Sequence, residues 1–334
     1  MRKFSVLLLT MVAFGSSVSF STIASAGYTQ ADLRPFPAGY IDSPFVMPDE
    51  SAIYFIHSPA ATIDMLTANP EVQPVTASLP GHQASDSGFW WNTDIYVSHR
   101  SPDGTWGEPE NLGAEINTEN LEGGPWLNDE QTTLIFMRES VTDPSLSGAF
   151  MATRPTANDP WGIPERLPGV LGTYAIDGYT DFHLVPSGNL YFWSEMPDGN
   201  GTLYWAQSTG ENEWSAPQRM PEVLHSDKDE SQPWVNDAET EICFNRRGDD
   251  GNTQLLCSTR ADPGMDWSAP DVIPIAGIAD ANGATVWGEP SFAEDGTMYF
   301  VRFDTADPQW PAELMLSRRE ADGGYGMPEP LVFG

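Results

Sequence analysis

The stretch Glu122-Gly-Gly-Pro-Trp-Leu-Asn-Asp-Glu-Gln-Thr-Thr-Leu-Ile-Phe-Met-Arg138 decides the fold of this chain. It predicts two β-strands around a polar turn near residues 129–131, because turn-forming residues separate two apolar runs of strand length. An acid opens the first strand and an Arg closes the second. With the turn centred on Glu130, Glu122 and Arg138 should lie opposite each other on the hairpin.

Four more stretches follow the same plan, and a second motif marks the outer part of each unit. This motif is an aromatic residue, two further residues and Pro, and it occurs as Trp106-Gly-Glu-Pro109, Trp161-Gly-Ile-Pro164, Trp214-Ser-Ala-Pro217, Trp267-Ser-Ala-Pro270 and Tyr325-Gly-Met-Pro328. Short runs rich in β-branched and aromatic residues lie between the motifs, and no stretch has a sustained helical period. Four short strands per unit, repeated five times, predict an all-β fold, a five-bladed β-propeller of four-stranded antiparallel blades.

The ends of the chain divide it into three parts. Residues 1–26 have the features of a secretory signal peptide, with basic residues, an apolar run and a small-residue cleavage site. Residues 27–41 form an N-terminal segment that packs against the fifth blade, unless blade-to-blade packing alone closes the ring. The propeller covers residues 42–334, with blades near 42–113, 122–168, 181–221, 230–275 and 289–334. We therefore expect a periplasmic or secreted protein that does not insert into the membrane.

The chain is strongly acidic, with a formal net charge of −33 at pH 7. Nucleic acid and anionic membrane surfaces would repel such a protein, so we exclude both as partners. We expect a monomer. The two cysteines, Cys243 and Cys257, should face each other across a turn centred on Asp250. In an exported protein this spacing is compatible with a cross-strand disulfide, and two buried thiols are the alternative.

The repeat resembles a known family. The segments Asp94-Ile-Tyr-Val-Ser98 and Trp106-Gly-Glu-Pro-Glu-Asn-Leu-Gly113, with the turns at Asn128-Asp129 and Asp295-Gly296, are similar to the WD-repeat-like β-propeller repeat of TolB-type periplasmic proteins. The third unit departs from the pattern, with Pro186-Ser-Gly188 at its turn. The resemblance implies the propeller fold, and it implies little about function because such repeats mostly mark binding scaffolds.

Each predicted inner hairpin pairs an acid with a polar or basic residue. The pairs are Asp42 with His57, Glu122 with Arg138, Asp181 with Ser194, Glu230 with Arg246, and Glu289 with Arg302. The start of the first strand and the end of the second share one face of a propeller, so the acids should surround one mouth of the channel. Opposed charges are an ordinary stabilising feature of hairpins. As a set around a preformed opening, they favour binding of a polar ligand.

The first blade has a long insertion between its second and third strands. It contains Trp90 and Trp91, whose large rigid faces suit stacking on sugar rings or contact with a protein partner. Packing of the two tryptophans onto the propeller is the alternative.

These observations predict an exported, non-enzymatic propeller. It should bind a polar small molecule or oligosaccharide, or a periplasmic protein, through the paired residues and the two tryptophans at the channel mouth. We expect no cofactor and no metal, although acidic loops such as residues 249–252 offer oxygen ligands to calcium.

The alternative is a glycoside hydrolase or a sialidase-like enzyme that uses the carboxylates at the mouth. Propellers of the furanosidase type place three acids on the first three inner strands, where this chain has Asp42, Glu122 and Asp181. Two of these differ from the residue types that such enzymes use, and the acids recur in all five blades. Sialidase chemistry would use the three arginines Arg138, Arg246 and Arg302.

Overall fold

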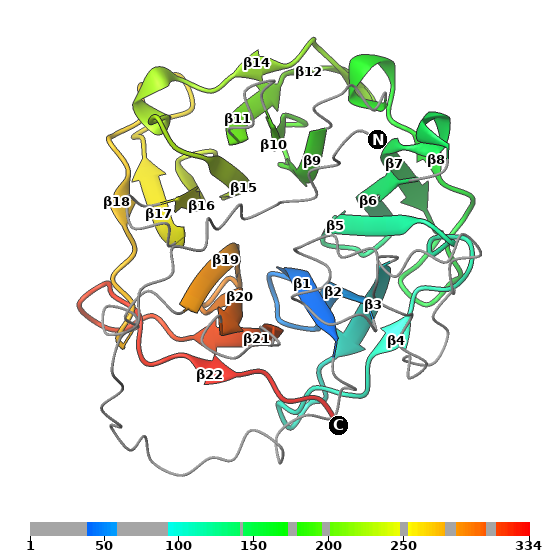
Figure 1. Cartoon of the computed structure of the whole chain (residues 1–334), viewed down its shortest axis with the longest axis horizontal. Helices are drawn as coiled ribbons and strands as arrows, with labels where there is room; N and C mark the ends of the chain where they lie inside the picture. The colour runs from blue at the N-terminus through cyan, green and yellow to red at the C-terminus, as the bar shows by residue number, and fades with distance from the viewer. Residues whose placement is uncertain are drawn as a thin grey trace, which may run out of the picture.

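The computed structural model describes residues 39–58, 93–140, 143–172, 179–195, 201–247, 253–277, 285–304 and 312–334. In these residues, five four-stranded antiparallel sheets stand around a central channel (Figure 1). The predicted all-β, five-bladed β-propeller is confirmed. The signal peptide assigned to residues 1–26 and the segment 27–38 lie outside the described residues. Among the residues that the structure describes, no helix is long and apolar enough to cross a membrane.

Each blade is one meander of four strands, ordered from the channel to the rim. The strands of the first two blades are β1 (Tyr40–Val46), β2 (Ala52–Ser58), β3 (Asp94–His99), β4 (Glu110–Asn111), β5 (Leu121–Leu127), β6 (Thr133–Glu139), β7 (Gly148–Thr153) and β8 (Glu165–Arg166). The third blade has β9 (Tyr179–Leu184), β10 (Leu190–Glu195), β11 (Gly201–Ala206) and β14 (Gln218–Arg219), with a small added hairpin of β12 (Ser208–Gly210) and β13 (Glu213–Trp214). The last two blades have β15 (Glu230–Val235), β16 (Glu241–Arg247), β17 (Thr253–Thr259), β18 (Asp271–Val272), β19 (Thr285–Phe292), β20 (Met298–Asp304), β21 (Ala312–Ser317) and β22 (Glu329–Pro330). In the described connections, short 3₁₀ segments are formed by η2 (Pro144–Leu146), η3 (Gly169–Gly172) and η4 (Glu222–Leu224).

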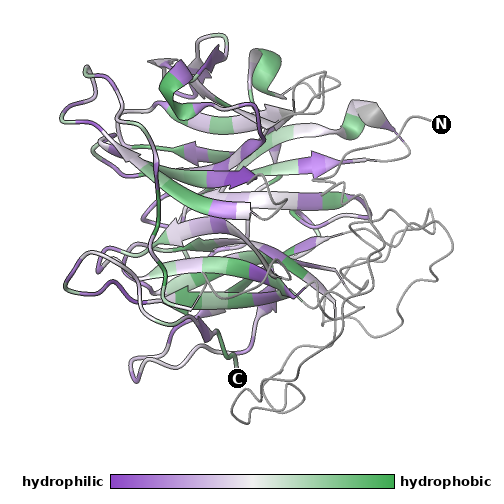
Figure 2. Ribbon diagram, turned by 60° about the vertical axis from the view of Figure 1, so that its left-hand side comes forward, coloured by the Kyte–Doolittle hydropathy of each residue, from purple (hydrophilic) through white to green (hydrophobic). Residues whose placement is uncertain are grey.

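The second strand of every blade forms the core. Each carries one Phe at the same position, and all five are fully buried: Phe55, Phe136, Phe192, Phe244 and Phe300. Burying each ring stabilises the fold by about 1.5–3 kcal/mol. In the side view the strands carry most of the hydrophobic colour, while many loops at the edges are hydrophilic (Figure 2).

Tyrosines of the first, third and fifth blades hold each of these blades to the next one. Each Tyr donates from its hydroxyl to the first turn of the following blade: Tyr54 to Gln131 (2.8 Å), Tyr191 to Glu239 (2.8 Å) and Tyr299 to Glu50. The three acceptors have φ values of 54–55°, a left-handed conformation that turns the chain sharply.

An Arg on the blade that receives the Tyr hydrogen bond fixes the same turn. Arg154 and Arg260 donate to the turn carbonyls of Gln131 and Glu239, at 2.7 and 2.6 Å. The Trp of the Trp-x-x-Pro motif packs against this Arg, with ring centroids 4.1 Å away in the second blade and 4.2 Å away in the fourth. In these blades the Trp of the motif covers the guanidinium that holds the turn. In the third blade Trp214 instead donates to the turn carbonyl of Gly188 at 2.8 Å.

The ring closes between the fifth and first blades by the same contact and by the C-terminus. Arg100 pairs with Glu50, which also accepts from Tyr299. The last residues of the chain lie beside the first blade (Figure 1), where Gly334 N–H donates to the carbonyl of Trp106 at 3.0 Å. The described residues thus provide a closure at the C-terminal end. β1 begins at Tyr40, so the last two residues of the predicted segment 27–41 belong to the first blade.

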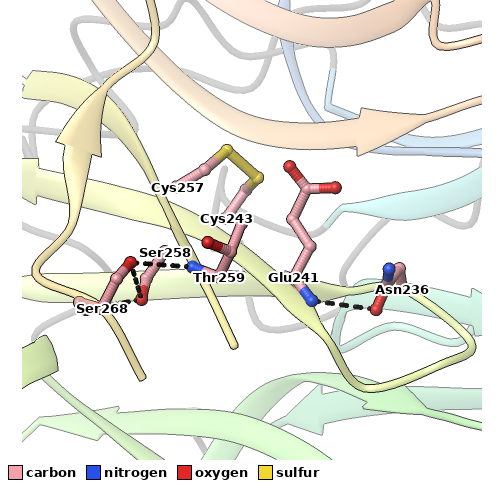
Figure 3. Close-up of a disulfide and its surroundings, with 7 residues drawn as sticks. All are labelled: Asn236, Glu241, Cys243, Cys257, Ser258, Thr259 and Ser268. Carbon is pink, nitrogen blue, oxygen red and sulfur yellow. Dashed lines mark hydrogen bonds between the residues drawn. A yellow bond between two sulfur atoms is a disulfide. The ribbon is translucent and has the colours of Figure 1, made fainter. Parts of the chain in front are cut away.

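The second and fourth blades have no Tyr at this position, since Ile135 and Cys243 occupy it. The structure joins Cys243 to Cys257, directly opposite on β17, in the disulfide that the spacing predicts (Figure 3). Glu241 lies close to both sulfur atoms. Because the two sulfurs are bonded to each other, neither is a thiolate that could bind a metal.

We predict that Tyr299→Phe destabilises the protein more than Tyr54→Phe. The first change removes a hydrogen bond to a carboxylate, worth about 1.5–3 kcal/mol. The second removes one to a neutral amide, worth about 0.5–1.5 kcal/mol, and a longer one of 3.3 Å that Arg154 donates to the hydroxyl. Urea unfolding of the two variants measures the difference. Equal losses would show that the carboxylate adds nothing to ring closure.

Candidate functional site

The residue at one position of every inner strand lines the channel in a left-handed conformation. These residues are Ser43, Gly124, Asp181, Gln232 and Glu289, with φ values of 50–58°, and all five border one cavity. Each lies in a β-bulge that interrupts the pairing of the inner hairpin. A non-glycine residue in this conformation costs roughly 1–2 kcal/mol, so four of the five positions hold strained backbone at the channel.

Three carboxyl groups from three blades meet at this position. Asp181 and Glu289 occupy it directly, and Asp42 lies one residue before it. Asp42 and Glu289 are buried and hydrogen-bonded to each other, whereas Asp181 is partly exposed. Tyr40 donates its hydroxyl to Asp42, and the indole of Trp193 donates to Asp181.

The three carboxyls are hard to ionise together. Burial raises the pKa of Glu289 well above its usual value, and the charges of Asp42 and Asp181 raise it further. Burial also raises the pKa of Asp42. The pKa of Asp181 rises to about 6, first through burial and then through the charge of Asp42. At neutral pH the cluster therefore keeps at least one proton, as closely spaced buried carboxyls do.

An aromatic floor closes the channel below the carboxyls. It consists of side chains two or three positions further along the inner strands: Phe45, Trp126, His183, Trp234 and Phe292. Their ring centroids are 4.5–6.4 Å apart, and the pair Phe45–His183 joins the first blade to the third. Burial lowers the pKa of His183 to about 4, so the ring is neutral at pH 7. The cavity above has a volume of about 50 Å³, which holds a few water molecules.

The acids of the second and fourth blades have a different environment. Glu122 pairs with Arg138 at 2.6 Å and Glu230 with Arg246 at 2.8 Å, in the predicted register. Each acid also accepts from a hydroxyl four residues before it, Thr118 or Ser226.

Both arginines also donate to a backbone carbonyl of the connection that enters the blade. Arg138 contacts the carbonyl of Ile116 at 2.8 Å, and Arg246 contacts that of Leu224 at 3.0 Å. Burial raises the pKa of Glu122 to about 7 in spite of Arg138. These two sets of contacts fasten a connection to a strand, and neither acid lines the cavity.

The other three predicted pairs are wrong in register. His57 is opposite Ile41 rather than Asp42, Ser194 is opposite Tyr179 rather than Asp181, and Arg302 is opposite Trp287 rather than Glu289. Arg302 pairs instead with Glu313 on β21. Asp181 and Glu289 lie within the bulge, where a residue has no direct partner on the opposite strand, and Asp42 is offset by one residue, opposite Ile56. Trp90 and Trp91 lie outside the described residues.

A different alignment of the sequence distinguishes the two kinds of acid. The inner strands can be aligned on the proline that follows the bulge, a position held by Phe182 in the third blade. Asp181 and Glu289 then come directly before Phe182 and Pro290. Glu122 and Glu230 come three residues before a Pro, with a hydroxyl residue four positions earlier. The same alignment places Gln232, directly before Pro233, at the position of Asp181 and Glu289. Pairing counted from the turns does not indicate this residue.

The sequence matches no protein-family model and no curated protein. Similar solved structures include an α-L-arabinofuranosidase from Lactobacillus brevis, with 12% identity and a TM-score of 0.53, over 91% of this chain and 99% of that one. The catalytic domain of a GH62 α-L-arabinofuranosidase from Coprinopsis cinerea has 14% identity and a TM-score of 0.54, over 87% and 92%. TolB from Acinetobacter baumannii has 12% identity and a TM-score of 0.41, over 88% of this chain and 57% of TolB.

At these identities the likeness to the two arabinofuranosidases shows a shared fold. It contradicts the prediction of a non-enzymatic binding propeller, because propellers of similar length and fold are glycoside hydrolases. The prediction of a TolB-type repeat is confirmed only for the propeller itself.

We predict that Gly124→Ala disturbs the site and that Gly123→Ala does not. A Cβ on Gly124 would lie 2.6 Å from Oδ1 of Asp181 and 3.2 Å from its backbone N, at a φ of 56°. A Cβ on Gly123 would meet only side-chain atoms at 3.7 Å. Gly124→Ala should therefore cost about 1–3 kcal/mol of unfolding free energy, measured in urea. Equal stability of the two variants would contradict the close approach.

We further predict that Asp181→Asn stabilises the protein at neutral pH. The folded-state pKa of Asp181, about 6, exceeds the usual 3.8, so the folded protein loses stability as the pH rises from 4 to 6. The variant's advantage over the natural protein should grow by up to about 3 kcal/mol between pH 4 and pH 7 in urea unfolding. Asp103→Asn is the control, because hydrogen bonds to Thr105 lower the pKa of this exposed residue. No growth for Asp181→Asn would show that burial does not penalise its charge.

Proposed function

We propose that this protein is an exported glycoside hydrolase with its active site at the channel mouth. Its substrate is an oligosaccharide or a simpler glycoside, and its reacting groups are Asp42, Asp181 and Glu289. The observation that carries the proposal is a cluster of three carboxyls from three blades, of which Asp181 and Glu289 line one cavity and Asp42 is hydrogen-bonded to Glu289 behind it. At least one proton is kept among the three carboxyls. The fold shared with two arabinofuranosidases supports it.

Glycoside hydrolysis needs a carboxylic acid and a carboxylate on opposite sides of the scissile bond. The pair of Asp42 and Glu289 is the acid, since burial and mutual repulsion keep a proton on it at neutral pH. Asp181 is the base, because its pKa of about 6 leaves it ionised at pH 7, and it is the most accessible of the three.

The reaction balances with these groups alone. The glycosidic C–O bond breaks and its oxygen takes the proton of the Asp42–Glu289 pair. A water molecule bonds to the anomeric carbon and gives its proton to Asp181. Exchange with solvent returns the proton from Asp181 to the pair, which completes the cycle.

This assignment differs from the one that the sequence suggests for a hydrolase. Glu122 is replaced by Glu289, because Glu122 is bound to Arg138 and Thr118, whereas Glu289 lines the cavity. The reacting carboxyls thus come from the first, third and fifth blades.

We predict hydrolysis of 4-nitrophenyl α-L-arabinofuranoside, or of another member of a panel of 4-nitrophenyl glycosides. Asp181→Asn and Glu289→Gln should each lower kcat/KM at least about 100-fold, the usual contribution of a general acid or base. Activity should fall below pH about 6, where Asp181 takes up a proton. Product release is followed by absorbance over pH 4–9.

Glu119→Gln is the control for these measurements, because Glu119 is an exposed acid in the connection that precedes β5. It should leave the rate unchanged. An absence of hydrolysis across the panel, or full activity in Asp181→Asn, would contradict the proposed function.

A further inference from the structure

Glu289 belongs to a closed set of three hydrogen bonds with two neutral side chains. Its backbone N–H donates to Asn245 Oδ1 at 3.2 Å. Asn245 Nδ2 donates to Gln232 Oε1, and Gln232 Nε2 donates to Glu289 Oε1. All three residues are buried. None of these contacts has a role in the chemistry described above.

The set has only one consistent orientation of its two amides. Because an N–H of the backbone can only donate, Asn245 must present its oxygen to Glu289 and its nitrogen to Gln232. Gln232 must then accept with its oxygen and donate with its nitrogen. A donor is thereby fixed on Oε1 of Glu289, and that oxygen carries no proton itself.

Room for this arrangement depends on the residue before Glu289. A Cβ on Gly288 would lie 3.1 Å from Asn245 Nδ2 and 3.5 Å from Gln232 Oε1. The strand therefore has no side chain at the point where the two amides meet.

The partner carboxyl is held from its other side. Tyr40 donates to Oδ2 of Asp42, so one oxygen of each carboxyl has a fixed donor. The remaining oxygens, Asp42 Oδ1 and Glu289 Oε2, are buried, and no donor group of the described residues is hydrogen-bonded to either of them. Two carboxyls that are hydrogen-bonded to each other need a proton between them.

We propose that Gln232 and Asn245 are positioning residues that keep the proton of Glu289 on Oε2, directed at Asp42 Oδ1. They act through Glu289 and do not touch the scissile bond. The position of the proton on Glu289 is independent of the proposed function, whereas its transfer to a glycosidic oxygen rests on that function.

The elements packed around Asp42 and Glu289 contribute several charged and titratable groups. β1 contributes Tyr40, and β9 contributes Asp181 and the neutral His183. On the other strands packed against β19, three ion pairs are formed: Glu230 with Arg246, Arg247 with Asp229, and Arg302 with Glu313. The partly buried Asp304 is the last residue of β20. Glu241 lies beside the disulfide.

The test is the pH titration of Glu289, followed by NMR of protein labelled with ¹³C at the glutamate side-chain carboxyl. The Glu289 signal is assigned by its loss in Glu289→Gln. In the natural protein this signal should remain that of a protonated carboxyl at pH 7. A signal typical of an ionised carboxyl would overturn the proposal without any variant.

Two variants test the positioning residues. Gln232→Met removes the donor on Oε1 without adding charge, which should raise the titration midpoint by about 1–2 units. The side chain of Asn245 does not contact the carboxyl of Glu289, so Asn245→Leu acts through Gln232. Without the donor from Asn245, Gln232 can turn its amide oxygen toward Glu289, and the titration midpoint of Glu289 should also rise. Gln254→Met, at an exposed position on β17, is the matched control and should leave the midpoint unchanged.

Kinetics separate this inference from the proposed function. If the protein hydrolyses a glycoside, Gln232→Met should lower kcat roughly 10- to 100-fold with little change in KM, and it should move the alkaline limb of the pH profile upward. Raised midpoints without hydrolysis in any version would support the positioning and contradict the proposed function. Midpoints that stay unchanged in the folded variants would overturn the positioning, whatever the activity.

Discussion

A β-propeller is stable only when the contact between its last and first blades is as favourable as the contacts between the other neighbouring blades. In this protein the meeting depends on Glu50, which lies in a strained turn between Tyr299 of the fifth blade and Arg100 of its own blade. The same arrangement of hydroxyl, turn and guanidinium joins the first blade to the second and the third to the fourth. Because closure uses the contact that also builds the ring, no separate closing strand is needed among the described residues.

The five blades are of two kinds, which alternate along the chain, so that two blades of one kind, the fifth and the first, are neighbours where the ring closes. The first, third and fifth blades carry the bridging tyrosines, and they also carry the three carboxyls of the channel. The second and fourth blades carry an ion pair that fastens the incoming connection, as Glu122 and Arg138 do. The acids that fasten the incoming connections and the channel carboxyls are therefore on different blades. An acid that is neutralised by Arg is unsuited to proton transfer, whereas the channel acids form no ion pair with the basic residues that the structure describes.

The repeat made the strands, their number and the disulfide predictable. Residues of the second blade paired as predicted because Glu122 and Arg138 lie in the regular part of the hairpin, beyond the bulge. The same counting failed for Asp181 and Glu289, since both lie within the bulge and point into the channel. A bulge depends on local backbone conformation, which pairing arithmetic does not contain. The contact of Gln232 with Glu289 joins residues 57 positions apart, and no periodicity within one unit indicates it.

The aromatic floor gives the channel a direction. Rings from the first and third blades meet across the axis, so the space above them is blind rather than a passage through the disc. Whatever enters must leave by the same mouth, and in the reverse order. If a glycoside is cleaved there, the fragment nearest the mouth departs first and the fragment at the floor departs last. The sugar held deepest would then act as a competitor of fresh substrate, and its escape would set an upper limit on turnover.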